Sequence, residues 1–393
     1  MNLKQIAILK TFLYREYFPF SMKSVEEGKA KIVIPKYDKI TAKMPVFYNP
    51  AMKLNRDISV LVLDSIEENN LLIADPLAGS GIRSIRFLLE LNKKKIKKIY
   101  INDYSKIAIK YLRKNLLLNK INKNKIKISN KDANIFLLES FGFDYIDIDP
   151  FGYPGRFWDS AIKRMSKKGI LAVTATDTSA LCGSSSNACL RKYGAKPLRN
   201  ECMHELGIRI LIKALQTIGA KYEKALVPLF SFSKEHYMRV FLQCEKSKKS
   251  ADDVLKNHGY FLYCKECLFR AVTKDIFNSN ICPNCKRELD YAGSLWLGQL
   301  WDNDFLKKIN LNKAPFEAYK LLETINEEAK IDAVAFYEIN KICEKYNIER
   351  CPKINAIIDK LRKKNQATRT HFSNICIRTD ADIKEVVKVM RAI

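Results

Sequence analysis

No stretch of this sequence approaches the roughly 18 consecutive apolar residues that a membrane-spanning helix needs. The N-terminal stretch is also unlike a signal peptide, because Lys10 interrupts its apolar core and no small-residue cleavage site follows. We therefore expect a cytoplasmic protein that does not associate with a membrane. Met22 could equally be the start of the protein, which would leave residues 1–21 as a tail, and we place the N-terminal tail at 1–24.

Acidic residues are few, with 43 Asp and Glu against 69 Lys and Arg, which gives a formal net charge of +26. Such an excess of cations favours a polyanion as partner, because clustered Lys and Arg bind phosphates by releasing condensed counterions. Histidine is scarce as well, and the four histidines show no metal-ligand spacing, so no histidine-based metal site is predicted. No internal repeat is found. No obligate protein partner is evident, and a monomer is compatible with the sequence.

The chain has 393 residues, which favours two or three domains, and its 47% hydrophobic residues are enough to fill their cores. Apolar strand-like runs alternate with helical patterns from residue 71 to residue 244, a rhythm typical of a parallel sheet covered on both faces. Two later runs, 224–230 and 237–245, are expected to form an antiparallel edge. A charged break at 245–253 then marks a boundary. We expect a catalytic domain at 25–250 and a second domain at 251–393.

A glycine-rich turn, DPLAGSGIRSIRF (75–87), follows the first predicted strand and opens a helix. Such a turn lets the backbone approach a ligand closely, and the helix N-terminus adds oriented N–H groups. Asp103 ends the second strand, where a carboxylate can bind both hydroxyls of a ribose. Asp132 follows the third strand and is a candidate for an adenine amino group. The turn lacks the third glycine of a dinucleotide motif, which favours S-adenosylmethionine over NAD.

The stretch DIDPFGYPGRFW (147–158) places Asp149 at the end of the fourth strand, where open parallel sheets bind their ligands. A carboxylate and a backbone carbonyl there suit methyl transfer to an exocyclic amine, because they accept its N–H bonds and the carboxylate can remove the proton. Phe151 can stack on the base, which must be flipped out of a helix to reach such a pocket. A plain strand-ending Asp-Pro turn is the alternative interpretation.

Several segments together resemble the tRNA guanine-26 N2,N2-dimethyltransferases of archaea and eukaryotes. They run in family order over most of the chain from Glu27 onward, and the turn LAGSGIR departs from other members in its small residues. The matching segments are EGKAKIVIP (27–35), VFYNPAMKLNRD (46–57), GIRSIR (81–86), DIDPFGYP (147–154), TDTSALCG (176–183) and HELGIRIL (204–211).

The resemblance implies a class I, Rossmann-like methyltransferase fold with a mostly parallel seven-stranded sheet, followed by a smaller α+β domain that binds tRNA. It implies that Asp149 accepts the proton and that Phe47 and Phe151 sandwich the guanine. It also implies a cofactor site, in which two arginines contact the methionine end of S-adenosylmethionine, one acid binds the ribose and two residues lie on the adenine side. In that order these residues are Arg56, Arg83, Asp103, Asp132 and Ala133.

Two C-x2-C motifs, Cys264 with Cys267 and Cys282 with Cys285, are separated by fourteen residues. Four thiolates at this spacing can close a tetrahedron around Zn²⁺, with no position left for a substrate, so we predict a structural zinc site. The seven other cysteines are scattered and are expected to be reduced thiols. The zinc module is expected to shape a tRNA-binding face. Basic helices after Pro315, including residues 353–372, are candidates for phosphate contacts, although a solvated helix face is the commoner role of such lysine runs.

These observations predict an enzyme that dimethylates N2 of guanine 26 in tRNA with S-adenosylmethionine as the methyl donor. Two alternatives stay open. An enzyme of similar chemistry could methylate another exocyclic amine, such as adenine N6 in DNA. A different class is a zinc-ribbon nucleic-acid-binding protein without enzymatic activity.

Overall fold

The computed structural model describes residues 21–37, 41, 44–276 and 280–393, and it divides the chain into two compact units, 1–136 and 137–393. The predicted tail at 1–24 lies outside the described residues up to residue 20. The domain boundary that the sequence predicts near residue 250 stays a prediction. None of the helices in the described ranges has both the length and the apolar character that a membrane crossing requires.

The first unit is built on three parallel strands in the order β5-β4-β3, with a separate β1–β2 hairpin. Its helices and strands are β1 (Met22–Glu27), β2 (Ala30–Pro35), η1 (Pro50–Met52), α2 (Lys53–Ser65), β3 (Leu71–Asp75), α3 (Ile82–Glu90), β4 (Ile96–Asn102), α4 (Lys106–Leu118), η2 (Lys123–Lys125) and β5 (Ile126–Ser129). Helix α5 (Ala133–Leu138) begins near the end of the first unit. The hairpin was not predicted from the sequence.

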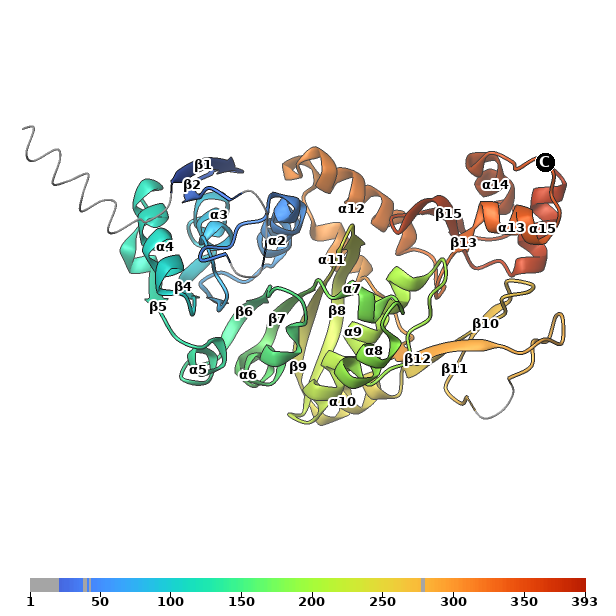
Figure 1. The fold of residues 1–393 in the computed structure, drawn as a ribbon, viewed down its shortest axis with the longest axis horizontal. Helices are drawn as coiled ribbons and strands as arrows, with labels where there is room; N and C mark the ends of the chain where they lie inside the picture. Colours follow the sequence, from blue (N-terminus) through green and yellow to red (C-terminus); the bar gives the residue numbers. More distant parts are fainter. Residues whose placement is uncertain (1–20, 38–40, 42–43, 277–279) are drawn as a thin grey trace, which may run out of the picture. The chain divides into compact units, whose positions relative to one another are not determined.

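The second unit contributes strands in the order β6-β7-β9-β8, of which β6 and β7 are parallel and β9 and β8 form the antiparallel edge (Figure 1). Its first elements are β6 (Phe143–Ile148), η3 (Pro154–Phe157), α6 (Trp158–Arg164), β7 (Met165–Ala175), α7 (Thr178–Leu181), α8 (Ser186–Tyr193), α9 (Met203–Ala220), β8 (Lys224–Lys234), β9 (Tyr237–Lys246) and α10 (Lys248–Leu255). The seven strands make one mostly parallel sheet, so the predicted fold class is confirmed.

The sheet forms because its strands are continuous apolar runs. Strand β7 is buried at seven successive residues from Gly169 to Ala175, and β8 and β9 are buried along most of their length. Continuous burial is expected for strands covered on both faces. Helix α9, whose buried residues lie all round its surface, packs against β8.

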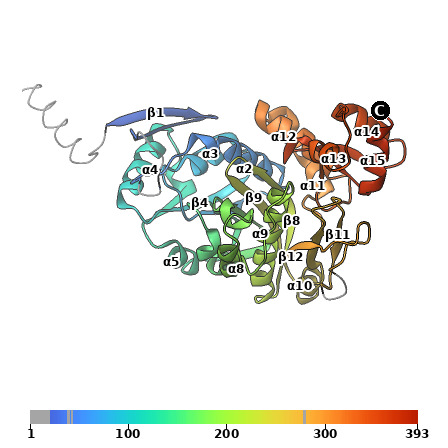
Figure 2. The same ribbon diagram turned by 45° about the vertical axis from the view of Figure 1, so that its right-hand side comes forward.

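The rest of the second unit contains two three-stranded sheets, β11-β10-β12 and β13-β15-β14, and a cluster of C-terminal helices (Figure 2). The elements are β10 (His258–Tyr263), β11 (Arg270–Thr273), β12 (Asp290–Trp296), α11 (Asn303–Lys308), η4 (Leu311–Lys313), α12 (Phe316–Glu328), β13 (Tyr337–Glu338), α13 (Ile339–Lys345), α14 (Ile354–Leu361), β14 (Ala367–Thr370), β15 (Ser373–Thr379) and α15 (Ile383–Arg391). The predicted α+β character of this region is confirmed.

One sequence prediction in this region is wrong. A basic helix was expected over 353–372, but α14 ends at Leu361 and residues 367–370 form strand β14, paired with β15. The β-branched threonines at 368 and 370 favour a strand, and both are buried. Pairing with β15 therefore decides the structure of this segment, and the lysines at 363 and 364 lie in the connection rather than on a helix face.

Candidate active site and zinc module

The glycine turn of the first unit is arranged as a ligand loop. Gly79 has a φ of +53°, and a Cβ atom there would lie 2.8 Å from the carbonyl oxygen of Phe47. The same carbonyl accepts a hydrogen bond from the N–H of Ser80 at 3.2 Å. Glycine is required here both by the backbone conformation and by this close approach. The predicted base-stacking residue Phe47 is thereby held against the turn.

Asp103, the predicted ribose acid, lies directly beside this turn. Its Oδ2 accepts the N–H of Gly79 at 2.8 Å, and its Oδ1 accepts the N–H of Ser105 at 2.8 Å. Burial raises the pKa of this carboxyl group, and the two N–H bonds lower it by less. The structure therefore brings together the glycine turn and the acid that sequence reasoning assigned to one site.

The two arginines assigned to the methionine end are both buried. Arg83 donates from Nη1 to the Oδ1 of Asn55 at 3.1 Å and to the Oγ of Ser59 at 2.9 Å. Arg56 donates from Nε and Nη2 to the carboxylate of Glu27, each at 2.6 Å. Both guanidinium groups are thus held in fixed orientations, and their contacts with a cofactor stay a prediction.

The residues assigned to the adenine side start a helix. Asp132 is exposed, and its Oδ1 accepts the N–H groups of Asn134 at 2.8 Å and Ile135 at 3.3 Å, which caps the first turn of α5. Ala133 is buried. The capping interaction is sufficient to explain an acid at position 132, and its adenine role stays a prediction.

The two acids of the DIDP segment differ sharply in their surroundings. Asp147 is buried within β6, where Arg239 of β9 donates to both of its carboxylate oxygens, at 3.0 and 2.7 Å, and the hydroxyl of Tyr145 donates at 2.7 Å. Asp149 follows the end of the strand and is only partly buried, and Phe151 is 56% exposed. Asp147 therefore belongs to the core, and Asp149 is the acid that the strand end presents.

The four cysteines of the C-x2-C motifs come together as predicted. All four Sγ atoms lie within 4.8 Å of one another, and the pairs Cys264–Cys285 and Cys267–Cys282 are each 3.4 Å apart. Sulfurs bound tetrahedrally to zinc at about 2.3 Å would be about 3.8 Å apart, so the cluster fits this ion.

The backbone around the sulfurs repeats itself in the two motifs. The N–H of Leu268 donates to the carbonyl of Cys264, and the N–H of Lys286 donates to the carbonyl of Cys282. Both donor residues have a positive φ, 56° and 62°. Each motif is therefore a knuckle that directs two thiol groups to one point. The buried core around them is small: in the described cluster, Leu289 is the one buried residue besides Cys264 and Cys282.

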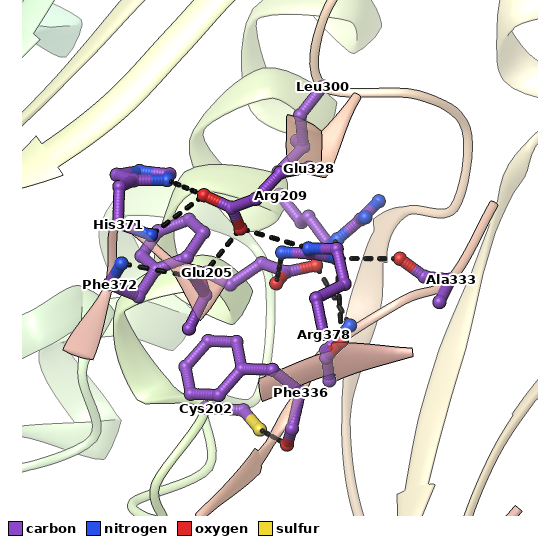
Figure 3. A network of polar contacts seen from close by, with 12 residues as sticks. Cys202, Glu205, Arg209, Leu300, Glu328, Ala333, Phe336, His371, Phe372 and Arg378 are labelled. Atoms are coloured by element: carbon purple, nitrogen blue, oxygen red, sulfur yellow. Dashed lines mark hydrogen bonds and ion pairs between the residues drawn. The ribbon is translucent and has the colours of Figure 1, made fainter. Parts of the chain in front are cut away.

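Sequence reasoning missed residues that support these sites. Thr176 accepts the N–H of Gly152, and Asp177 accepts the hydroxyl of Tyr193, against which Tyr153 packs. In the sequence, both residues stand out only as part of the TDTSALCG segment. A buried network of acids and arginines also went unpredicted: Glu205 of α9, Glu328 of α12 and Arg378 of β15 are joined by ion pairs (Figure 3).

Comparisons with known proteins agree with this geometry. The family model described as N2,N2-dimethylguanosine tRNA methyltransferase matches residues 28–391. The tRNA (guanine(26)-N(2))-dimethyltransferase of Methanobrevibacter smithii is 42% identical over 390 residues, covering 95% of this chain and 98% of the relative. A relative in Aquifex aeolicus, named tRNA (guanine(26)-N(2)/guanine(27)-N(2))-dimethyltransferase, is 39% identical over 384 residues, covering 94% and 96%.

Among solved structures, Trm1 from Pyrococcus horikoshii in complex with S-adenosyl-L-methionine superposes with a TM-score of 0.83 at 35% identity. The match covers 94% of this chain and 99% of that chain. Fold, family model and full-length relatives agree, and the chain belongs to the N2,N2-dimethylguanosine tRNA methyltransferase family.

Proposed function

We propose that this protein transfers two methyl groups in succession from S-adenosylmethionine to the exocyclic N2 of guanine 26 in tRNA. Membership of the family and the full-length likeness to named guanine-26 dimethyltransferases support the reaction and the substrate. The observation that carries the catalytic assignment is the contrast in β6, where Asp147 is bound within the core and Asp149 is presented at the strand end. We place the reaction in the cytoplasm.

Asp149 acts as the proton acceptor. The lone pair of the guanine amino group is delocalised into the ring, and a carboxylate that accepts an N–H bond favours a more nucleophilic nitrogen. When bound, the cofactor supplies an electrophilic methyl group. The nitrogen would gain a bond to that methyl carbon as the carbon–sulfur bond of the cofactor breaks and leaves its electron pair on sulfur, and the proton that the nitrogen loses would go to Asp149. Phe47 and Phe151 stack on the two faces of the flipped base.

The cofactor is held by residues of the first unit. Asp103 receives the ribose hydroxyls beside the Gly79 turn, Arg56 and Arg83 bind the methionine carboxylate end, and Asp132 with Ala133 contacts the adenine. The fixed position of Asp103, which already accepts the N–H of Gly79, supports the ribose assignment. The four cysteines hold one structural Zn²⁺ that orders the β10–β12 module.

Incubation of the purified full-length chain with S-adenosylmethionine and an unmodified tRNA transcript tests this function. The transcript is then digested and its methylated nucleosides are identified by mass. Parallel transcripts carry adenosine at position 26 or at position 27. N2,N2-dimethylguanosine should form in the wild-type transcript and in the position-27 transcript but not in the position-26 transcript. Dimethylation that survives the position-26 change would refute the assigned position.

An Asp149→Ala variant tests the catalytic assignment separately. Transfer should be abolished while S-adenosylmethionine binding, measured by calorimetry, is retained. Methyl transfer at the wild-type rate by this variant would show that another group accepts the proton.

A further inference from the structure

Thr176 and Gly152 are joined by two hydrogen bonds. The N–H of Gly152 donates to the Oγ1 of Thr176 at 2.6 Å, and the N–H of Thr176 donates to the carbonyl of Gly152 at 3.2 Å. The two residues follow β6 and β7, which are parallel neighbours, so the loops after both strands emerge at the same edge. One threonine therefore binds both polar groups of the backbone at Gly152.

Gly152 immediately follows Phe151 and lies three residues after Asp149. Its φ is +80°, a conformation that favours glycine, yet nothing lies within 4 Å of the position that a Cβ atom would occupy. The glycine is thus required by the backbone conformation and not by crowding. Phe151, a residue that is 56% exposed, is carried by the backbone directly before Gly152. Fixing Gly152 therefore restricts the backbone of the base-binding segment.

A second support for the same segment begins at the neighbouring residue, Asp177. Its carboxylate accepts hydrogen bonds from the hydroxyl of Tyr193 at 2.6 Å and from the Nζ of Lys192 at 3.0 Å. Tyr153 in turn packs edge-on against the ring of Tyr193, with centroids 5.3 Å apart, and donates its hydroxyl to the carbonyl of Lys192 at 2.8 Å. The pair at 176 and 177 therefore supports the segment on both sides of the peptide between Gly152 and Tyr153.

We infer that Thr176 is a positioning residue for methyl transfer, which holds the segment from Asp149 to Gly152 so that the carboxylate and the aromatic ring keep their directions. This inference rests on the proposed function. In this role Thr176 contacts neither the base nor the cofactor. Thr176 acts through the backbone of Gly152.

The second methyl transfer should depend on Thr176 more than the first. Unmodified guanine offers two N–H donors at N2, whereas the monomethylated base offers one, and that one carries the proton that must leave. The monomethylated amine is therefore oriented by fewer hydrogen bonds and needs a more strictly placed acceptor. Loosening the segment should leave monomethylguanosine as a larger share of the product.

Thr176→Val and Thr176→Ser are the variants that test this role. Valine keeps the shape of threonine but removes the acceptor for the Gly152 N–H, while serine keeps the hydroxyl. Thr217→Val is the matched control, since Thr217 is an exposed threonine of α9 whose hydroxyl donates to the carbonyl of Lys213. For each protein, single-turnover rates of both transfers, the ratio of mono- to dimethylguanosine, cofactor affinity and the melting temperature are measured.

Thr176→Val should slow the second transfer by about tenfold to a hundredfold, the scale expected for a small misplacement of reacting groups. It should slow the first transfer less, with cofactor affinity unchanged, and Thr176→Ser should restore both rates. Equal loss of both transfers, wild-type kinetics in Thr176→Val, or a Thr176→Ser variant as defective as Thr176→Val would overturn the inference. Failure of the wild-type protein to methylate guanine 26 would instead refute the proposed function.

Discussion

Arg378 of β15 donates from Nη2 to the carboxylate of Glu205 on α9, across 173 positions of the sequence. The same guanidinium donates from Nε to Glu328 at 3.0 Å, and both glutamates are fully buried. Glu205 also accepts from Arg209 at 2.9 Å (Figure 3). Glu328 also accepts from the hydroxyl of Thr370 at 2.6 Å. Within the second unit, this network joins α9, the helix that packs against β8, to the C-terminal strand β15.

Replacing Arg378 should therefore destabilise the protein strongly. Arg378→Met leaves two buried carboxylates short of a cationic partner, which costs about 3–5 kcal/mol of unfolding free energy. Chemical denaturation followed by circular dichroism measures the change. Arg369→Met on the adjacent strand is the matched control, because Arg369 is exposed, and it should change stability by no more than about 0.5 kcal/mol. Equal losses from the two substitutions would contradict a special role for the network.

The ion pairs of this network could not be predicted from the sequence, whereas the strands of the sheet could. The sheet strands were predictable because each is a local apolar run with its own signal, as in LLIAD at 71–75. The proximity of Asp103 to Gly79 was predictable as well, since strand ends of one parallel sheet share an edge. The partnership of Glu205 with Arg378 had no local signal, because nothing in the neighbourhood of either residue specifies a partner so far away.

The missed residues of the candidate site have a similar explanation. Thr176 matters through the backbone N–H of Gly152, and a backbone group leaves no mark in the sequence beyond the glycine itself. The sequence predicts a helix where β14 lies, because the lysines before this strand continue the helical pattern of α14. The β1–β2 hairpin is also hard to predict, because its strands are short and carry many charged residues. Its position depends on Glu27, whose partners Arg56 and Arg86 lie on other elements.

Glu27 should make the stability of the protein fall in acid. Burial raises its pKa, but the hydrogen bonds and charges of Arg56 and Arg86 outweigh burial and lower the pKa to about 2, from an ordinary value of 4.5. A depressed pKa contributes stability that is present above pH 4.5 and is lost as the pH falls towards 2. The shift corresponds to about 3 kcal/mol.

Unfolding curves at several pH values, for the wild-type protein and for Glu27→Gln, measure this contribution. The variant should be less stable at pH 7, and the difference should shrink between pH 4.5 and pH 2. Glu26→Gln is the matched control, because Glu26 is exposed and its ion pair is with the exposed Lys31. A difference between wild type and Glu27→Gln that is constant over this range would disprove the buried-pair explanation.

Removing zinc should unfold the β10–β12 module while leaving the cofactor site intact. The purified chain should contain about one zinc per molecule by atomic emission, because four thiolates complete one tetrahedral site. Cys282→Ser should lower the zinc content, the melting temperature and the affinity for tRNA, with S-adenosylmethionine affinity unchanged. Cys351→Ser, at an exposed cysteine outside the cluster, should keep the full zinc content. Zinc retained at the wild-type level by Cys282→Ser would exclude this residue as a ligand.

Asp103→Asn should weaken S-adenosylmethionine binding by about tenfold, because a hydrogen bond to a charged acceptor contributes about 1.5–3 kcal/mol and the amide keeps only part of it. The amide oxygen can still accept the N–H of Gly79, but the amide nitrogen cannot accept that of Ser105, so the turn keeps its bond to this side chain while the melting temperature should fall modestly. Calorimetric titration with the cofactor provides the measurement. Asp253→Asn, at an exposed acid paired with Lys256, serves as the matched control and should bind normally.

Because the ribose hydroxyls are the proposed partners of Asp103, 2′,3′-dideoxy analogues of the cofactor should bind the wild type and Asp103→Asn with similar affinity. A variant that loses as much affinity for the analogue as for the cofactor would place Asp103 in the architecture of the turn and not in contact with the ribose.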